Sequence, residues 1–384
     1  MNFCINSKID EISIYDVKDL DVEKLFLGFF LAAYEIRKYK KEKGEEIRIY
    51  TNVEKNIIEK VEKIRDAVFL ARDLGNEPAN ILNPVTFAER VIEIFSNYKN
   101  VIVEVLNERD LEREKLNAIL AIGNSSVNKP RLIVIKYLPK KDEKPIVLIG
   151  KGVCFDAGGL DIKPAEYMID MKSDKSGAAN VVAIIKLLAD FNVQKNVIGI
   201  LPLIENVISE RATKPSDIIK IGDKTVEIVS TDAEGRLIIA DAIEYSKRFN
   251  PSLYIILATL TGAQIVALGY KIAALYTNDK EIRKKIMKIS REEKEFVWPM
   301  PLPKFYKKLI KGDLTDLKNL PSINSKEAGS IIGALFIREF IGNNKFVYLD
   351  IAGPAIYPKD ELWIKKGASG FGVRLIANLI QSLS

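Results

Sequence analysis

The 384-residue sequence contains no histidine. This absence excludes catalysis by Ser-His-Asp or Cys-His pairs, because both need an imidazole as the general base. It also excludes zinc sites of the HExxH type and every other arrangement that uses histidine as a metal ligand. Any chemistry must therefore depend on carboxylates, lysines, arginines, hydroxyl groups or bound ions.

Cysteines and long apolar runs are scarce as well. The two cysteines, Cys4 and Cys154, are interpreted as reduced thiols of a cytosolic protein rather than as a disulfide. The longest apolar runs, such as residues 146–150, are far shorter than the roughly 20 residues that cross a bilayer. Residues 1–11 are charged and have no signal-peptide core. The sequence therefore predicts a cytoplasmic protein without membrane contact.

Neither sign of charge is in large excess. The chain has 58 basic and 52 acidic residues, a formal net charge of +6, and the two signs alternate along most of its length. This pattern is typical of a solvated surface first and of a polyanion-binding surface only second. The basic runs 37–43 and 283–294 leave nucleic-acid binding as an alternative function. Both runs alternate with glutamates and contain no recognised nucleic-acid motif, so nucleic acid is not the expected partner.

The length of the chain and the order of its elements predict two unequal domains. Residues 1–65 are expected to form a small, reduced α/β domain of weak strands with one helix over 22–41. After a further helix over 57–74, residues 66–384 alternate strands and helices, which indicates an α/β fold with a mostly parallel sheet covered by helices on both faces. The expected strands cover residues 101–105, 131–137, 146–150, 197–203, 254–260 and 345–351, and the expected helices cover 178–191, 237–248 and 330–341.

Three polar clusters follow apolar strands, at the sheet edge where an α/β protein builds its site. They cover residues 150–159 with Lys163, residues 170–177, and residues 230–236. The glycines of the first cluster could make turns or cradle a phosphate, but their spacing is not that of a nucleotide-binding GxxxxGK[ST] loop. The acidic residues of the other two could simply cap or complement the helices that follow.

Taken together, the clusters bring four carboxylates to one edge of the sheet: Asp156, Asp174, Asp232 and Glu234. Four uncompensated anions would repel one another and raise one another's pKa values. Two divalent cations would balance this charge, and oxygen ligands suit such ions when no imidazole is present. A water shared by two such ions can have its pKa lowered toward about 7, which yields a hydroxide nucleophile without histidine.

Several strings in and around these clusters match the pattern of one enzyme family. The most specific is Thr231-Asp232-Ala233-Glu234-Gly235-Arg236-Leu237, whereas the glycine-rich cluster 150–159 alone would be weak. Further strings are Ala258-Thr259-Leu260-Thr261-Gly262-Ala263 and Leu349-Asp350-Ile351-Ala352-Gly353. From about residue 71 to 379, the sequence resembles the leucyl aminopeptidase family, peptidase family M17. The resemblance implies an enzyme that removes single residues from the free amino end of short peptides.

The resemblance implies that Asp156 and Glu234 bridge two divalent metal ions, which could be zinc, manganese or cobalt. Asp232 would complete the more exchangeable site, and Asp174 with Lys151 the tighter one. A lysine ligand must be a neutral amine, and lowering its pKa from about 10.4 to below 7 costs roughly 5 kcal/mol, a demand that two adjacent dications can meet. Lys151 is therefore expected to be buried.

The resemblance also assigns residues to catalysis and to substrate binding. Lys163 would keep its proton and stabilise the oxyanion on the scissile carbonyl, and Arg236 would hold a bicarbonate ion as general base. For both, an ordinary salt bridge to nearby carboxylates is the alternative. The substrate amine would bind the tighter metal and Asp174, and Met171 could equally be core packing. The implied pocket for the first side chain contains Met171, Thr259, Leu260, Gly262, Ala352 and Ala355.

The sequence departs from the family pattern at two points. Ser230 stands where members usually have asparagine, which leaves the preferred first side chain open. The region before the catalytic likeness, about 65 residues, is shorter than is usual in the family, which weakens any role given to it. The family forms hexamers, so a homo-hexamer is expected. A two-metal phosphoesterase uses similar carboxylates, but the family strings disfavour it.

Overall fold

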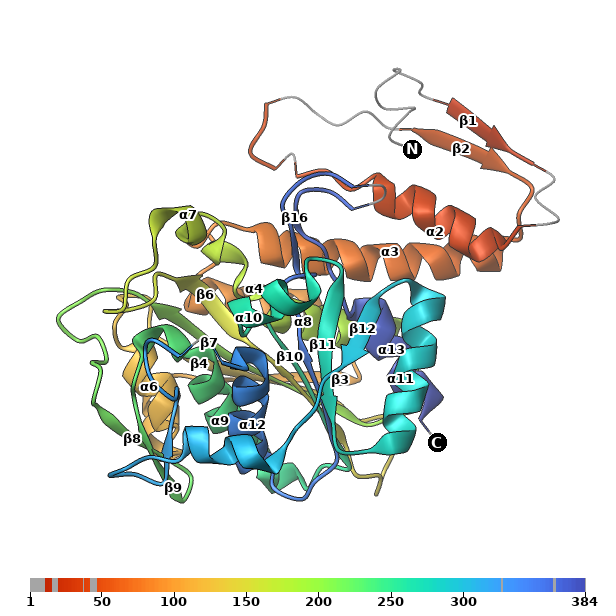
Figure 1. Ribbon diagram of the computed structural model, residues 1–384. Helices are drawn as coiled ribbons and strands as arrows, with labels where there is room; N and C mark the ends of the chain where they lie inside the picture. The colour runs from red at the N-terminus through yellow and green to blue at the C-terminus, as the bar shows by residue number, and fades with distance from the viewer. Residues whose placement is uncertain are drawn as a thin grey trace.

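The computed structural model describes residues 11–15, 20–36, 38–41, 47–325, 327–361 and 364–383. The expectations for Cys4 and for residues 37, 42 and 43 of the basic run 37–43 concern residues outside this description. A large sheet forms the centre of the described chain (Figure 1), with the strand order β12-β11-β14-β10-β5-β7-β4-β3 and with β6 paired to β7. Its strands are β3 (Val101–Leu106), β4 (Arg131–Tyr137), β5 (Ile146–Gly150), β6 (Gly152–Asp156), β7 (Val197–Asn206), β10 (Leu253–Ala258), β11 (Ile272–Thr277), β12 (Phe296–Pro299) and β14 (Phe346–Asp350).

The sheet is mixed but mostly parallel, which confirms the predicted fold class. Strands β14, β10, β5, β7 and β6 run parallel to one another. Strand β4 is antiparallel to β7 and β3, and β11 is antiparallel to β14 but parallel to β12. Every residue of β5, β7, β10 and β14 is buried. Strands covered on both faces need continuous apolar runs, and this is why the central strands could be read from the sequence.

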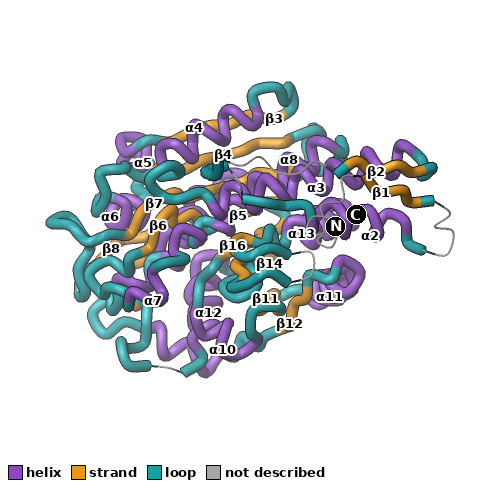
Figure 2. The backbone as a smooth tube through the Cα atoms, turned by 90° about the horizontal axis from the view of Figure 1, so that it is seen from above, coloured by secondary structure: helices purple, strands orange, loops and turns teal. Residues whose placement is uncertain are grey.

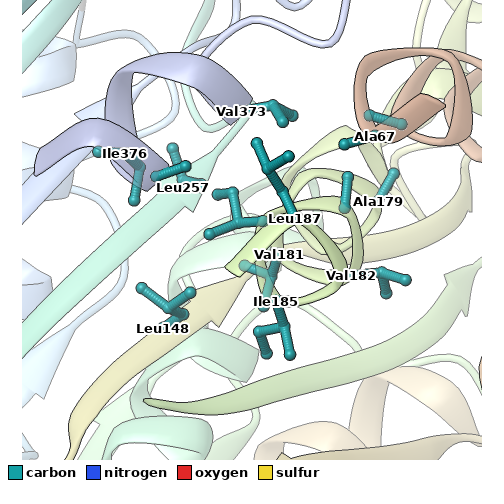
Figure 3. Packing of buried hydrophobic residues seen from close by; sticks show 14 of the residues in the cluster. Ala67, Leu148, Ala179, Val181, Val182, Ile185, Leu187, Leu257, Val373 and Ile376 are labelled. Atoms are coloured by element: carbon teal, nitrogen blue, oxygen red, sulfur yellow. The ribbon is translucent and has the colours of Figure 1, made fainter. Parts of the chain in front are cut away.

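Helices cover both faces of the sheet (Figure 2). Figure 3 shows how α8 fills one face, with Val181 and Ile185 directed toward Leu148 of β5 and with Ile376 of α13 nearby. This face is covered by α3 (Lys55–Asn76), α4 (Pro84–Phe95), α8 (Ser176–Asp190), α11 (Lys280–Glu293) and α13 (Val373–Ser382). The other is covered by α6 (Asn117–Gly123), α9 (Gly235–Ser246) and α12 (Gly329–Ile341).

The amino-terminal region contains a parallel pair of strands, β1 (Glu11–Ile14) and β2 (Arg48–Thr51), and the helix α2 (Val22–Ala32). The sequence predicted this helix to continue to residue 41, and that was wrong. The N–H of Ala33 bonds back to the carbonyl of Phe30, which closes the helix with a tight turn. Tyr34 then turns toward α3, where its hydroxyl donates to Asp73 at 2.8 Å. After Ala33 the chain therefore contacts α3 through Tyr34 instead of continuing the predicted helix.

The basic run 283–294 forms most of α11, an amphipathic surface helix. Ile282, Ile286 and Ile289 are buried against the sheet. On the exposed side, Lys284 pairs with Glu281 and Lys288 with Glu292. This is the arrangement of a solvated helix face rather than of a basic patch for nucleic acid.

The remaining elements are shorter, and several of them carry the candidate site. In the part of the chain that the structure describes, no helix has the length and apolarity needed to pass through a bilayer. The remaining elements are α5 (Glu108–Arg113), α7 (Ala165–Met168), α10 (Gly262–Leu268), β8 (Ile218–Ile221), β9 (Lys224–Glu227), β13 (Leu317–Lys318), β15 (Ile356–Tyr357), β16 (Gly367–Ala368) and the 3-10 helices η1 (Met171–Ser173), η2 (Thr231–Ala233), η3 (Lys247–Phe249) and η4 (Lys304–Ile310).

Candidate metal centre and active site

The residues proposed from the sequence meet at the carboxyl ends of the central parallel strands. Burial of the strands fixes the positions of these ends, and short turns and 3-10 helices then carry the polar side chains. The site is built from Lys151 after β5, Asp156 at the end of β6, Lys163 before α7, Asp174 after η1, Asp232 in η2, Glu234 before α9 and Thr259 after β10.

Lys151 is buried at the centre of this cluster, as expected. Its Nζ donates to Asp174 Oδ1 at 2.9 Å and to the Thr259 carbonyl at 3.0 Å, and lies 3.0 Å from Glu234 Oε1. A Cβ at Gly235 would stand 2.5 Å from Lys151 Cε, so only glycine leaves room for the lysine. Burial by itself lowers the pKa of Lys151, but the surrounding carboxylates outweigh it and raise that pKa.

Lys163 approaches the same cluster from the solvent side. Its Nζ lies 2.8 Å from Asp156 Oδ2 and also pairs with Asp232. The other oxygen of Asp156 accepts from the Gly158 N–H and from Asn206 Nδ2, each at 2.9 Å. One oxygen of Asp156 is therefore held by two neutral donors, and the other oxygen faces the ammonium group of Lys163.

The acidic residues of the site do not cap helices, so that alternative does not account for them. The side chain that caps η2 is Ser230, which accepts from the N–H of Asp232. Glu234 precedes α9 and Asp174 closely precedes α8, yet neither helix has a side-chain cap. Carboxylate oxygens of Asp156, Asp232 and Glu234 lie within 4.8 Å of one another, a group that could hold a metal ion. Side-chain capping of the following helices therefore does not account for these carboxylates.

The electrostatics of the cluster call for additional positive charge. Burial and the nearby Asp156 raise the pKa of Glu234 to about 8, although Lys151 opposes this shift. Burial likewise raises the pKa of Asp174 to about 6, again against the effect of Lys151. Glu234 Oε2 is buried and has no hydrogen-bond partner. Two lysines are therefore insufficient to satisfy these oxygens, and the oxygen-rich donor set fits hard or borderline divalent cations.

Arg236 lies on the first turn of α9 and is almost fully buried. Its Nη1 donates to the carbonyl of Asn319 at 2.7 Å, and its Nε has no hydrogen-bond partner. Burial lowers the pKa of Arg236, an effect that the nearby Tyr348 and Glu234 partly oppose. Among the described residues, no carboxylate forms the simple salt bridge with Arg236 that the sequence left open. The unpaired Nε–H of Arg236 is a buried donor that an anion could accept.

The residues implied for the first side-chain pocket lie around the end of β10 and the end of β14. Thr259 is buried and donates to Asp174 Oδ1 at 2.6 Å. Gly262 begins α10, and nothing lies within 4 Å of a Cβ built on it. Ala355 is 1% exposed and belongs to the hydrophobic core. Met171, Leu260 and Ala352 are partly exposed, and the pocket as a whole stays a prediction.

Two buried asparagines, which sequence reasoning did not assign, hold the acidic strings in place. Asn206 donates to Asp156 Oδ1 and to the Thr231 carbonyl. Asn319 accepts from the N–H groups of Val229 and Ser230 and donates to the Ser230 carbonyl. Nothing in the residues around Asn319 indicates that its side chain fixes a segment 90 residues away.

The fold and the site together define a metal-dependent hydrolase. Comparison with known proteins gives its family: the description "Cytosol aminopeptidase family, catalytic domain" matches residues 69–377. The chain belongs to this family, peptidase family M17, and is a metallo-exopeptidase that acts at the amino end of peptides. The predicted family is confirmed.

Individual relatives agree with this assignment. The probable cytosol aminopeptidase of Brucella ovis is 40% identical over 370 residues, which is 92% of this chain and 73% of the relative. That of Clostridium perfringens is 41% identical over 368 residues, 92% of this chain and 74% of the relative. Among solved structures, the cytosol aminopeptidase of Coxiella burnetii has a TM-score of 0.91 at 29% identity and covers 99% of this chain and 83% of that one. The bottromycin maturation enzyme BotP in complex with Mn has a TM-score of 0.90 at 28% identity, with 97% and 83% covered.

Proposed function

We propose that this aminopeptidase uses two divalent metal ions, with Asp156 and Glu234 as ligands of both. Asp232 completes one site, and Asp174 with Lys151 completes the other. The observation that carries the proposal is the buried Glu234, whose Oε1 lies 3.0 Å from Lys151 Nζ and whose Oε2 has no partner. A carboxylate so placed, with its pKa raised by burial, is suited to bind cations on both oxygens.

The cations, when bound, supply Lewis acidity and a water acidic enough to lose a proton near neutral pH. The chain contributes the remaining parts. Lys163 is an ammonium that stabilises the oxyanion of the scissile carbonyl. Arg236, with its unpaired buried Nε, holds bicarbonate as the general base that replaces histidine. Asp174 binds the free amine of the substrate, which restricts cleavage to the amino end.

The proposed substrates are short peptides with a free amino terminus. Their first side chain occupies the pocket of Met171, Thr259, Leu260, Gly262, Ala352 and Ala355. Manganese, zinc or cobalt suits the donor set, and the relative BotP has been solved with Mn. We further propose that the protein is cytoplasmic and assembles as a homo-hexamer. We also propose two domains, a small amino-terminal domain of residues 1–65 and a catalytic domain of residues 66–384.

The test is metal analysis combined with hydrolysis of a panel of amino-acid anilides. We expect two equivalents of divalent metal per chain, loss of activity with a chelator and recovery when Mn, Zn or Co is added back. Activity should also rise when bicarbonate is restored to degassed buffer. An aryl phosphate serves as the control substrate, and its metal-dependent cleavage in place of the anilides would overturn the proposal. One equivalent of metal at full activity would overturn the two-metal part alone.

A further inference from the structure

Asp350 is a buried carboxylate next to the site that has no place among the proposed ligands. It ends β14, and its side chain is fully buried. Its Oδ1 accepts from the N–H groups of Leu260 at 3.2 Å, Thr261 at 3.4 Å and Ala352 at 3.4 Å. Its Oδ2 accepts from Thr261 Oγ1 at 2.6 Å and Ser330 Oγ at 3.0 Å. Five neutral donors from three separate segments thus meet on one carboxylate.

Two of these segments carry residues of the proposed metal site and pocket. The segment after β10 begins with Thr259, whose carbonyl accepts from Lys151 Nζ and whose hydroxyl donates to Asp174. Two of the proposed pocket residues also donate to Asp350. They are Leu260, which follows Thr259, and Ala352, which lies in the loop after β14. Asp350 therefore links two parts of the proposed site. One is the segment after β10, where Thr259 contacts Lys151 and Asp174, and the other is Ala352 in the proposed pocket.

The five contacts suit a carboxylate better than an amide. The three backbone N–H groups can only donate, so Oδ1 must accept, and the two hydroxyls donate to Oδ2. An asparagine with its oxygen toward the N–H groups would direct its NH₂ group toward these hydroxyls, which would have to rotate and accept instead. A buried carboxylate without a cationic partner in these contacts carries a large desolvation cost, and burial raises the pKa of Asp350. Packing of β14 against its neighbours does not require such a group, because the rest of the strand is apolar or aromatic.

We propose that Asp350 is a positioning residue of the aminopeptidase reaction. It fixes the segment 259–261 and Ala352 relative to each other, and so sets the separation between the metal site and the pocket for the first side chain. It acts through these groups and touches neither metal nor substrate. This inference rests on the proposed pocket and metal ligands.

The test compares Asp350→Asn with Asp241→Asn in the metal-loaded enzyme. Asp241 is a suitable control because it too is fully buried and accepts from two backbone N–H groups, those of Ala118 and Ile119 in α6, and is not among the proposed metal ligands or pocket residues. Metal content and thermal unfolding are measured for each variant. The values of kcat and KM are then measured with alanine, leucine and phenylalanine anilides. For Asp350→Asn we expect wild-type metal content and a loss in kcat/KM of up to about 100-fold, as for a misplacement of about 1 Å. The loss should differ between the three anilides by at least about threefold.

A second pair of variants tests the same contact if Asp350→Asn does not fold. Thr261→Val removes the hydroxyl that bonds to Asp350, and Thr261→Ser keeps it. We expect Val to change the ratio of kcat/KM values between the anilides and Ser to restore it. An equal loss for all three anilides, or ratios like those of Asp241→Asn, would overturn the inference while leaving the proposed function intact. If the wild-type protein has no metal-dependent anilide hydrolysis, the proposed function itself fails.

Discussion

Exposure distinguishes the two lysines of the site. The side chain of Lys151 is 4% exposed and is enclosed by Asp174 and Glu234, whereas that of Lys163 is 14% exposed and pairs with Asp232, itself 39% exposed. A substrate carbonyl that arrives from solvent can therefore meet Lys163 but not Lys151. This difference supports the separate tasks proposed for them.

Lys163→Ala should lower kcat without removing metal. Removal of one donor to an oxyanion typically costs roughly 10²–10³-fold in kcat. Glu234→Ala should instead lose both metal and activity, because it removes a ligand shared by both sites. Atomic absorption and anilide hydrolysis on the same samples separate the two effects. Full activity of the Glu234 variant would refute the assignment of the ligands.

At this scale the sequence indicated which charged side chains meet at the candidate site but not the residues that hold them. Asp232, Glu234 and Arg236 lie in one short, specific string, so their type and spacing were informative. Asn206 and Asp350 each stand alone at the end of an apolar strand, and their partners come from distant segments. No local pattern indicates such contacts, because they are created by the tertiary fold.

Among the helices, α6 depends on another helix for its amino-terminal cap. Its own N-cap residue, Leu116, offers no side-chain hydrogen bond. Asp241 of α9 supplies the cap instead and accepts from the N–H groups of Ala118 and Ile119 at 2.7 and 2.9 Å. One of its oxygens has no partner, and burial raises the pKa of Asp241 to about 8.

This capping carboxylate should make stability depend on pH. In the unfolded chain its pKa is about 4, so between pH 4 and pH 8 the folded state binds more protons than the unfolded state. Stability from this group therefore falls as pH rises through that interval. In Asp241→Asn the contribution of this group to the slope disappears, and the variant should gain up to about 1.4 kcal/mol per pH unit relative to wild type. Urea unfolding at pH 5, 6, 7 and 8 measures this; parallel curves would contradict it.

Prediction of whole elements succeeded where burial was continuous and failed where a contact ended a helix. The central strands and α8 matched their apolar runs closely. Helix α2 ends at Ala32, and Tyr34 just beyond it bonds to α3, a long-range contact that no local signal specified. The expected domain boundary at residue 65 falls within α3, a continuous helix over residues 55–76, and this division stays a prediction.

On the scale of the whole molecule, a cavity of about 690 Å³ lies between α2, α3, one side of α13 and the carboxyl-terminal ends of α8 and α11. Gly28, in the middle of α2, lines it, and a Cβ there would meet nothing within 4 Å. Gly28→Ala should therefore stabilise the protein by about 1 kcal/mol through helix propensity. The control Gly75→Ala in α3 should destabilise it, because that Cβ would lie 2.6 Å from Ala368 Cβ. A lower urea midpoint for Gly28→Ala would contradict this.

Metal binding should stabilise the whole chain, because the ligands come from segments that only the folded state brings together. At free metal about 100-fold above its Kd, binding contributes about 2.7 kcal/mol per site. With an unfolding entropy of about 2.1 cal/mol/K per residue, a chain of 384 residues should then lose at least about 3 °C in Tm on chelation. The shift should be preserved in Lys163→Ala and absent in Glu234→Ala, as measured by calorimetry with and without chelator. An equal shift in wild type and Glu234→Ala would contradict the proposed role of Glu234 as a ligand of both ions.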